Sequence, residues 1–316
     1  MAPVTPSLEE AARAGAYRAA REGLAHRARD TAVLDVEGRD RESFLQGQLT
    51  QDVRSLTAGQ SRAAAALTPT GKLLFTARLV GLADRIRLLL PAGSRESALA
   101  HLRKFAAFQK VSVEDRSGAY RRLGLYGPRG LAPADLPAEI LCLAGEGEFS
   151  CELLVPLDRE ADARAWLDRQ GAVPIDPATA EILRVEAGRP RFGQDVDTSN
   201  LPDEAGLDAA ISSTKGCYVG QEIIARRRTY GRLNRRLIGY HFPEGILPAG
   251  TILRRGAAPG EAPEATQSGR VTSSVVSPRF GPIGLGFAFH DVAIGDRLVS
   301  VDDLARTAVA SVLPFV

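Results

Sequence analysis

Cys217 is the residue of this chain best placed to carry out chemistry. It lies in Lys215–Glu222, which reads KGCYVGQE, two residues from one of only four lysines in the chain. The residues that follow, Gln221–Thr229, have a helical pattern, with Glu222 in the first turn and three arginines in the last. A neighbouring lysine and a helix N-terminus both favour the thiolate, which is the reactive form of cysteine. The segment therefore predicts a reactive thiol.

A lone cysteine is, however, more often a small buried residue than a nucleophile. Cys217 lies between Gly216 and Gly220, which favour turns, and not between apolar residues as a buried cysteine would. Both glycines also allow a ligand to approach the backbone closely. This context favours a functional role for Cys217. Cys142 and Cys151 lie inside strand patterns instead, and we expect both in the core.

Glu186 is the second candidate, because it ends a well-delimited helix. Asp176 is the predicted N-cap, Pro177–Ala187 the helix and Gly188 the residue after it. A carboxylate in the last helical turn costs a few tenths to about 1 kcal/mol, so a compensating role is expected. A buried carboxylate there could accept two N–H bonds from a pterin or a similar ring edge. A surface salt bridge to Arg184, Arg189 or Arg191 would explain it equally well.

The elements that must position these residues alternate between helix and strand over the first 240 residues. Helices are expected from a capping box at Ser7 to about Arg29, and at Ser43–Leu49, Ser94–Phe108 and Asp158–Gln170. Strands are expected at Thr31–Val36, Ala63–Leu67, Leu73–Val80, Ile86–Leu90, Val111–Glu114, Leu123–Tyr126, Glu139–Leu143 and Phe149–Val155.

The chain changes character after Phe242, where short β segments alternate with glycine and proline as in a small barrel. These segments are Thr251–Leu253, Gly269–Ser274, Ile283–His290, Arg297–Val301 and Thr307–Leu313, with a surface loop at Gly256–Gln267. The sequence thus predicts an α+β region over 1–240 and a β-barrel domain over 241–316. The first region is expected to contain two interleaved subdomains, about 26–118 with 176–240, and 119–175.

Two glycine-bearing segments resemble nucleotide-binding loops but lack the required context. Thr70–Leu73 has neither the upstream glycine nor the following serine or threonine of a phosphate loop. Gly281–Gly286 lies in the β region, without a strand that leads into a helix. We expect both to be turns.

Composition excludes several classes of protein. A net charge of +2 favours neither nucleic acid nor an anionic membrane, and no apolar run is long enough to cross a bilayer. Three acidic residues argue against a transit peptide, so the cytoplasm is the expected location: Glu9, Glu10 and Glu22. The three cysteines and four histidines show no metal-ligand spacing, so we expect no metal site within the chain.

The segment Lys215–Glu222 resembles the K-G-C-Y-x-G-Q-E signature of YgfZ-type folate-binding proteins. These proteins are relatives of the glycine-cleavage T-protein, a folate-dependent aminomethyltransferase. Further blocks are similar to the family in the same order: Phe44–Val53, Leu183–Gly188 with Gly193 and Asp195, Leu201–Gly206, Gly269–Pro278 and Ile283–Phe287. The resemblance extends over nearly the whole chain from about His26.

This resemblance implies a T-protein-like ring of domains with tetrahydrofolate, or a derivative, in the central channel. Glu186 would meet the pterin, while Lys215 and Cys217 would line the channel mouth as the catalytic pair. It makes further residues candidates for binding the cofactor: Arg184, Gly216, Tyr218, Gln221, Glu222 and Arg226. The YgfZ-type branch is linked to assembly or repair of iron–sulfur enzymes, and through them to tRNA modification. Folate and iron–sulfur enzymes or assembly proteins are therefore the expected partners.

One departure from the T-protein pattern bears on catalysis. T-proteins carry an aspartate on the strand that Gly71–Arg78 resembles, but no acidic residue occurs between Asp52 and Asp84. Aminomethyl transfer would then lack a group to stabilise a developing cation. An iron–sulfur maturation factor is thus the first hypothesis and a folate-dependent one-carbon transferase the alternative. A third is a scaffold without ligand that docks partners through Arg226–Arg228.

Overall fold

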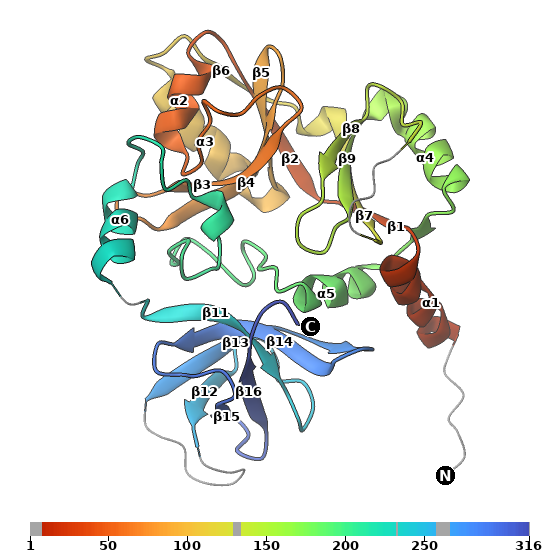
Figure 1. Cartoon of the computed structure of the whole chain (residues 1–316), viewed down its shortest axis with the longest axis vertical. Coiled ribbons are helices and arrows are strands. Elements are labelled where there is room, and N and C mark those ends of the chain that lie inside the picture. The colour runs from red at the N-terminus through yellow and green to blue at the C-terminus, as the bar shows by residue number, and fades with distance from the viewer. Residues whose placement is uncertain (1–7, 129–133, 232, 257–265, 316) are drawn as a thin grey trace.

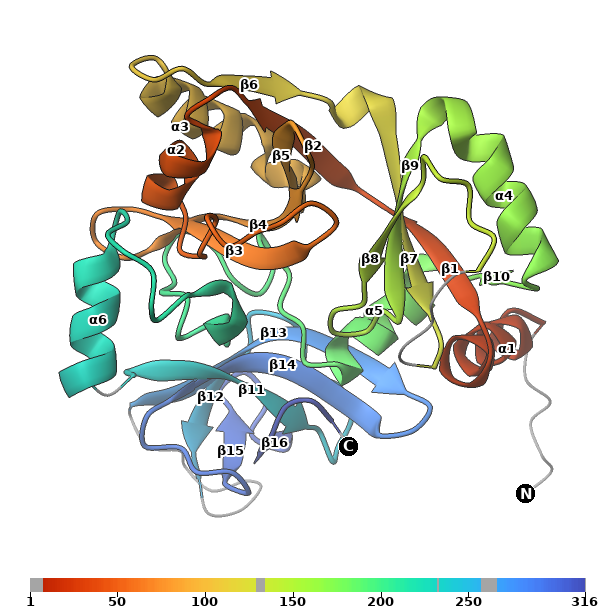
Figure 2. The same cartoon turned by 45° about the horizontal axis from the view of Figure 1, so that its top comes forward.

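The structure is a computed structural model that describes residues 8–128, 134–231, 233–256 and 266–315. Three bodies surround a central helix (Figure 1): two β-sheets with their own helices, and a closed barrel. The central helix is α5, Pro177–Glu186, which both views place between the second sheet and the barrel (Figure 2). The α+β fold with a C-terminal barrel that the sequence predicted is confirmed.

The first sheet is antiparallel, with the strand order β3-β4-β5-β2-β6. Apolar residues of α2 and α3 pack on one face, because Phe44, Leu45 and Leu102 join its main core cluster. The elements are β2 Thr31–Glu37, α2 Arg41–Gln48, β3 Ser61–Leu67, β4 Leu73–Gly81, β5 Arg85–Pro91, α3 Arg95–Ala106 and β6 Ser112–Asp115.

The second sheet has the order β10-β1-β7-β9-β8, and α4 covers one of its faces through Trp166 and Leu167. Leu143 and Leu154 on its other face contact Val33 and Val80, which joins the two sheets. The elements are α1 Leu8–Glu22, β1 Ala25–Arg29, β7 Tyr120–Tyr126, β8 Leu141–Ala144, β9 Cys151–Pro156, α4 Glu160–Arg169 and β10 Val173–Pro174.

Strand β1 corrects the prediction of a helix running to Arg29. The first helix ends at Glu22, and the next residues pair with β7 and β10 in the second sheet. Gly23 has little helix propensity and follows the last helical turn, which explains the earlier end. The strand therefore lies with 119–175 rather than with the subdomain proposed at about 26–118. The capping box at Ser7 falls outside the described residues.

The C-terminal domain is a closed six-stranded barrel, β11-β14-β13-β12-β15-β16. Its first strand, β11, precedes the predicted boundary at residue 241 and pairs with both β14 and β16, so it closes the barrel. Most of the predicted loop Gly256–Gln267 lies outside the described residues. The strands are β11 Arg235–His241, β12 Ile252–Arg255, β13 Gln267–Ser277, β14 Gly281–Phe289, β15 Arg297–Ser300 and β16 Thr307–Ser311.

The glycines predicted as a turn at Gly281–Gly286 lie in strand β14 instead. A Cβ atom on Gly284 would lie 2.7 Å from the Phe242 ring, and one on Gly286 would lie 2.8 Å from the Tyr240 ring. These glycines therefore make room for two barrel aromatics and do not break the strand. The turn predicted around Thr70–Leu73 is confirmed, with the Gly71 N–H donating to the Thr68 carbonyl at 2.9 Å.

Two of the three cysteines were expected in the core, and the structure confirms one of them. Cys151 is 1% exposed and packs under α4. Cys142 is exposed because β8 is an edge strand, which the sequence did not show. No helix within the described ranges is both long enough and apolar enough to cross a membrane.

Gly286→Ala should destabilise the protein by at least about 1–3 kcal/mol, because its methyl group would overpack the barrel. The added Cβ would lie 2.2 Å from the Arg270 carbonyl oxygen. Gly47→Ala is the matched control, since no atom lies within 4 Å of a Cβ there and alanine favours the α2 helix. Thermal unfolding followed by circular dichroism should show a lower midpoint for Gly286→Ala only. Equal midpoints would contradict the packing described.

Candidate functional site

A cavity of about 900 Å³ lies between the two sheets and α5. Ligand-binding cavities of proteins commonly measure about 300–1,000 Å³. Its walls come from β1, β7 and β9 of the second sheet, from β3 to β5 of the first sheet, and from α5 with the segment up to Ala210. Aromatic side chains are part of the lining: Tyr126, Phe149 and Phe192. The cavity is thus large enough for a cofactor-sized molecule.

A buried carboxylate organises one end of this cavity. Glu152 of β9 accepts hydrogen bonds from Arg78 Nη1 at 2.6 Å and from Arg122 Nη2 at 2.8 Å, and it also contacts Arg29. Arg29 and Arg122 lie directly opposite each other on β1 and β7, an arrangement that would be repulsive without the carboxylate beside them. Arg78 comes from β4, so the cluster joins the two sheets.

The arginines determine the charge state of this carboxylate. Burial raises the pKa of Glu152, but the charges of Arg122, Arg29 and Arg78 outweigh it and hold the pKa at about 2. Glu152 is therefore ionised at neutral pH.

Phe149 completes this wall beside the charged cluster. The guanidinium of Arg29 lies 4.5 Å from the centroid of its ring, and Tyr126 lies 5.0 Å away between ring centroids. A Cβ atom on Gly124 would lie 2.3 Å from the Phe149 ring, so only glycine leaves room for it. The wall thus combines aromatic and cationic groups.

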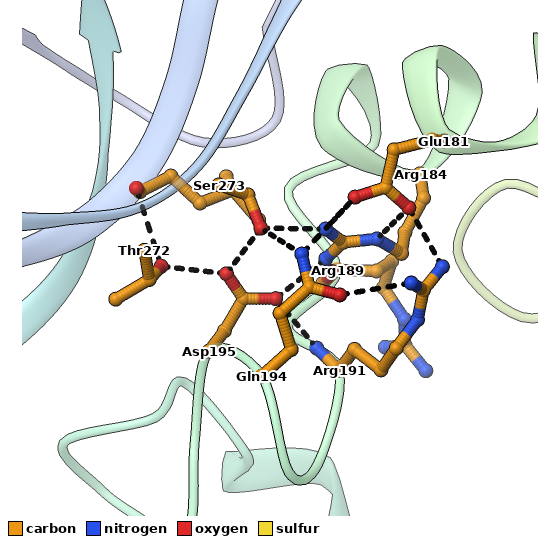
Figure 3. A network of polar contacts seen from close by, with 9 residues as sticks. Glu181, Arg184, Arg189, Arg191, Gln194, Asp195, Thr272 and Ser273 are labelled. Carbon is orange, nitrogen blue, oxygen red and sulfur yellow. Dashed lines mark hydrogen bonds and ion pairs between the residues drawn. The ribbon is translucent and has the colours of Figure 1, made fainter. Parts of the chain in front are cut away.

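Helix α5 forms the opposite wall and carries Arg184, a predicted cofactor ligand. Arg184 donates to Glu181 at 2.6 Å, to Asp195 at 2.7 Å and to Ser273 of the barrel at 2.7 Å (Figure 3). Asp195 also accepts a hydrogen bond from Thr272, which neighbours Ser273 on β13. The Arg184 side chain lines the cavity, but its hydrogen bonds tie α5 to the barrel. The main structural role of Arg184 is therefore to hold α5 against the barrel.

Glu186 does not line the large cavity. It faces a smaller one of about 260 Å³ that shares Glu148 and Phe149 with the large one. Tyr17 and Ser277 donate hydrogen bonds to Glu186 Oε1 at 2.8 and 2.5 Å. The other oxygen, Oε2, is buried and accepts no hydrogen bond from the described residues, although Arg21 of α1 forms an ion pair with it.

These contacts show how the chain accommodates a carboxylate at a helix C-terminus. The partner predicted for an ion pair was one of the arginines at 184, 189 or 191, whereas the structure supplies Arg21. Tertiary contact with α1 brings that arginine near, which spacing along α5 could not indicate. One oxygen of Glu186 retains the capacity to accept hydrogen bonds from a ligand.

Lys215 is buried and serves the local structure of the KGCYVGQE segment. Its ammonium group donates to the carbonyls of Gln46, Leu49 and Gln51 at 2.6, 2.5 and 3.1 Å, at the end of α2. Burial lowers the pKa of Lys215 to about 8, while the nearby Asp52 acts in the opposite direction. Its charge is thus directed to these carbonyls, and a place for Lys215 at a channel mouth stays a prediction.

Cys217 is exposed on the turn that leads into α6, Gln221–Tyr230. Gly220 adopts φ +83° as N-cap, and a Cβ atom there would lie 2.6 Å from the Thr68 carbonyl oxygen. The predicted helix after the cysteine and its glycine turn are confirmed. The thiol is accessible from outside the molecule.

The other predicted ligands in this segment line neither of the two cavities described above. Tyr218 is buried in a core cluster with Ile224, and its ring lies 5.0 Å from the Lys215 ammonium. Arg228 pairs with Asp203 and Asp208 at 3.1 and 3.3 Å, which reduces the basic patch predicted at the helix end. The remaining candidates are exposed or half-buried around the turn and helix: Gly216, Gln221, Glu222 and Arg226.

The structure therefore separates two groups that were predicted to share one cavity. Cys217 lines neither of these two cavities, and Glu186 lines only the smaller, so a cavity shared by the two residues stays a prediction. Neither the cluster at Glu152 nor Glu148, which lies at the junction of the two cavities, was predicted from the sequence. Charged residues inside otherwise apolar strands, Arg122 and Glu152, were the available signal.

No group of three or more potential metal ligands occurs in the part of the chain that the structure describes. At the junction of the two cavities, burial raises the pKa of Glu148. The site as a whole has hydrogen-bond donors, carboxylates and aromatic faces, which suit a polar heterocyclic ligand.

No family model matches the chain, but curated proteins do. The tRNA-modifying protein YgfZ of Edwardsiella ictaluri is 30% identical over 240 residues, covering 66% of this chain and 68% of that protein. YgfZ of Escherichia coli O157:H7 is 30% identical over 223 residues, with the same coverage. A putative chloroplastic transferase of Arabidopsis thaliana is 27% identical over 306 residues, covering 89% of this chain and 68% of that protein.

Among solved structures, glycine cleavage system aminomethyltransferase T from Bartonella henselae is similar to this chain with a TM-score of 0.84. The sequences are 23% identical, and the match covers 96% of this chain and 89% of that one. This likeness concerns the fold, which is the T-protein fold expected from the sequence.

Lys215→Met should lower the free energy of unfolding by about 1–3 kcal/mol, because buried carbonyl groups would lose their donor. Lys72→Met is the control, since Lys72 is exposed on a turn. Urea unfolding of both variants without any ligand measures the effect. If Lys215→Met were as stable as the wild type, the anchoring role of the ammonium group would be wrong.

Proposed function

The chain belongs to the YgfZ family within the aminomethyltransferase-like superfamily, and on this premise we propose that it binds a reduced folate and assists the assembly or repair of iron–sulfur proteins. The cavity of about 900 Å³ between the sheets and α5 carries the proposal. Tetrahydrofolate has a flat polar ring, an aromatic linker and carboxylates. The cavity offers aromatic side chains, carboxylates and arginines for these three parts.

The junction of the two cavities is the proposed place for the pterin ring. Phe149 lines both cavities and presents an aromatic face on which a flat ring can stack. Beyond it lies Glu186 Oε2, which accepts no hydrogen bond from the described residues. A ring edge with N–H groups would supply these bonds once Arg21, whose side chain is 36% exposed, moves aside.

The charge of the cavity wall disfavours the alternative of a one-carbon transferase. Strand β4 presents Thr76, Ala77 and Arg78 to the cavity, on the strand where T-proteins carry an aspartate. A cationic iminium next to a guanidinium would be repelled rather than stabilised. Folate in this site therefore serves better as a bound ligand than as an acceptor of an aminomethyl group.

The exposed thiol of Cys217 is the proposed contact with client proteins. It lies outside both cavities, so a partner can reach it while folate is bound. The turn that carries it is held by the Lys215 anchor and by the close approach of Gly220 to Thr68. A fixed, accessible thiol suits a contact with an iron–sulfur cluster or with a client cysteine.

The proposed clients are iron–sulfur enzymes or their assembly proteins in the cytoplasm. The relatives named as tRNA-modifying proteins are consistent with an effect on tRNA through such enzymes. In this proposal the chain itself does not bind tRNA, because its net charge is only +2.

Wild-type protein should bind tetrahydrofolate in isothermal titration calorimetry, and Glu186→Gln should weaken binding about tenfold or more, because a charge-assisted hydrogen bond contributes about 1.5–3 kcal/mol. Glu148→Gln is the comparison variant at the junction. Weaker binding by Glu148→Gln alone would move the pterin contact to Glu148. If no reduced folate produced any heat with the wild type, the ligand proposal would be wrong.

Cys217→Ser should lower the activity of iron–sulfur enzymes in a strain that depends on this protein, while the purified variant keeps its thermal midpoint and its folate affinity. Cys142→Ser is the control, because its thiol is also exposed but lies on strand β8. Full complementation by Cys217→Ser would exclude the thiol from the mechanism.

A further inference from the structure

The arginine cluster at Glu152 has more donors than the protein itself uses. Every nitrogen of Arg78 donates a hydrogen bond: Nη1 to Glu152, Nε and Nη2 to Ser61, and Nη2 also to the Ala144 carbonyl. Both oxygens of Glu152 are also occupied, Oε1 by Arg29 and Oε2 by Arg78 and Arg122. Any donor left over at this end of the cavity must therefore find a partner other than Glu152.

Arg122 has such a donor. The residue is 8% exposed and lines the large cavity. Its Nη2 atom donates to Glu152, but its buried Nε atom has no hydrogen-bond partner among the described residues. An unsatisfied buried donor costs about 1–3 kcal/mol, so native proteins rarely leave one without a ligand or a water molecule.

Arg29 lies directly opposite Arg122 and adds a second set of donors. It donates to Glu152 through Nη1, and its guanidinium lies over the ring of Phe149, which helps to fix its orientation. A guanidinium carries five N–H donors in a rigid plane, which suits recognition of planar oxyanions. The two arginines thus present donors to the cavity from adjacent strands.

The surrounding charges leave this end of the cavity cationic. Glu146 lies 3.8 Å from Arg78 Nε and 3.7 Å from Arg189 Nη2, so it is shared between two arginines. Burial raises the pKa of Glu148, which also lines the cavity. Over the whole lining, seven arginines face five carboxylates, Asp30 and Glu181 included, so positive charge is in excess.

We propose that Arg29 and Arg122 form a binding subsite for an oxyanion, a carboxylate or phosphate group, in the wall of the large cavity. The oxyanion accepts from the Arg122 guanidinium, which turns to bring its buried, unpartnered Nε–H to the cavity, and from the Arg29 guanidinium, beside the face of Phe149. It comes either from a small free anion or from a carboxylate of the larger ligand. Only the second source rests on the proposed folate function.

Calorimetric titration with inorganic phosphate tests the first source, and tetrahydrofolate compared with tetrahydropteroate, which lacks the glutamate, tests the second. Arg122→Gln should weaken binding of the oxyanion-bearing ligand at least tenfold, and Arg29→Gln should act in the same direction.

Arg121→Gln is the matched control, because Arg121 neighbours Arg122 on β7 but pairs with Glu160 at 3.6 Å outside the cavity. Thermal unfolding confirms that each variant is folded. Arg29→Gln decides the question if Arg122→Gln does not fold, since the Arg29 side chain is 35% exposed.

Phosphate binding that Arg122→Gln or Arg29→Gln weakens would assign the subsite to a free anion, whether or not folate binds. No phosphate binding, with a variant effect on tetrahydrofolate but not on tetrahydropteroate, would assign it to the ligand carboxylate. The proposal is overturned if the folded variants bind both kinds of ligand like the wild type. It is also overturned if the wild type binds neither phosphate nor the glutamate-bearing folate, whereas loss of folate binding alone would contradict only the proposed function.

Discussion

The ion pairs of Glu152 hold together the wall on which the large cavity depends. Arg29 and Arg122 come from neighbouring strands of one sheet, and Arg78 reaches the same carboxylate from the other sheet. Removal of Arg78 or Arg122, the buried partners, is expected to be strongly destabilising, because it leaves an uncompensated charge in a low-dielectric interior. The cluster therefore fixes both the distance between the sheets and the positive character of the space they enclose. Binding and folding use the same side chains here.

The proposed ligand binding and the proposed contact with clients lie in different parts of the structure, one interior and one exterior. The interior consists of two adjoining cavities that meet at Glu148 and Phe149. The exterior is the KGCYVGQE turn with its exposed thiol, anchored from below by Lys215. Helix α5 connects the interior to the barrel through Arg184, Asp195 and Ser273. A ligand that tightened the interior would act on the arrangement of domains, and not directly on the sulfur.

Much of the fold could be predicted from local signals, whereas the assembly of the site could not. The caps of α5 at Asp176 and Gly188 and the glycine turn before α6 were evident, because they depend on neighbours in sequence. Strand β1 was missed, since alanine and arginine favour helix until a sheet edge is available. The direction of Lys215 toward the end of α2 was equally hidden, because it depends on residues far away in the chain. Family resemblance correctly indicated the fold, whereas the cavity that it implied for both Cys217 and Glu186 is neither of the two described above.

The anchored turn at Cys217 also has a practical consequence for studying the protein. Cys151 is buried, so thiol-selective labels would attach at Cys217, and at Cys142 unless that residue is replaced by serine. A fluorophore or spin label on Cys217 would sit on a rigid support outside both cavities. With a second label on the barrel, the distance between the two labels would report whether the domains move when a small molecule binds.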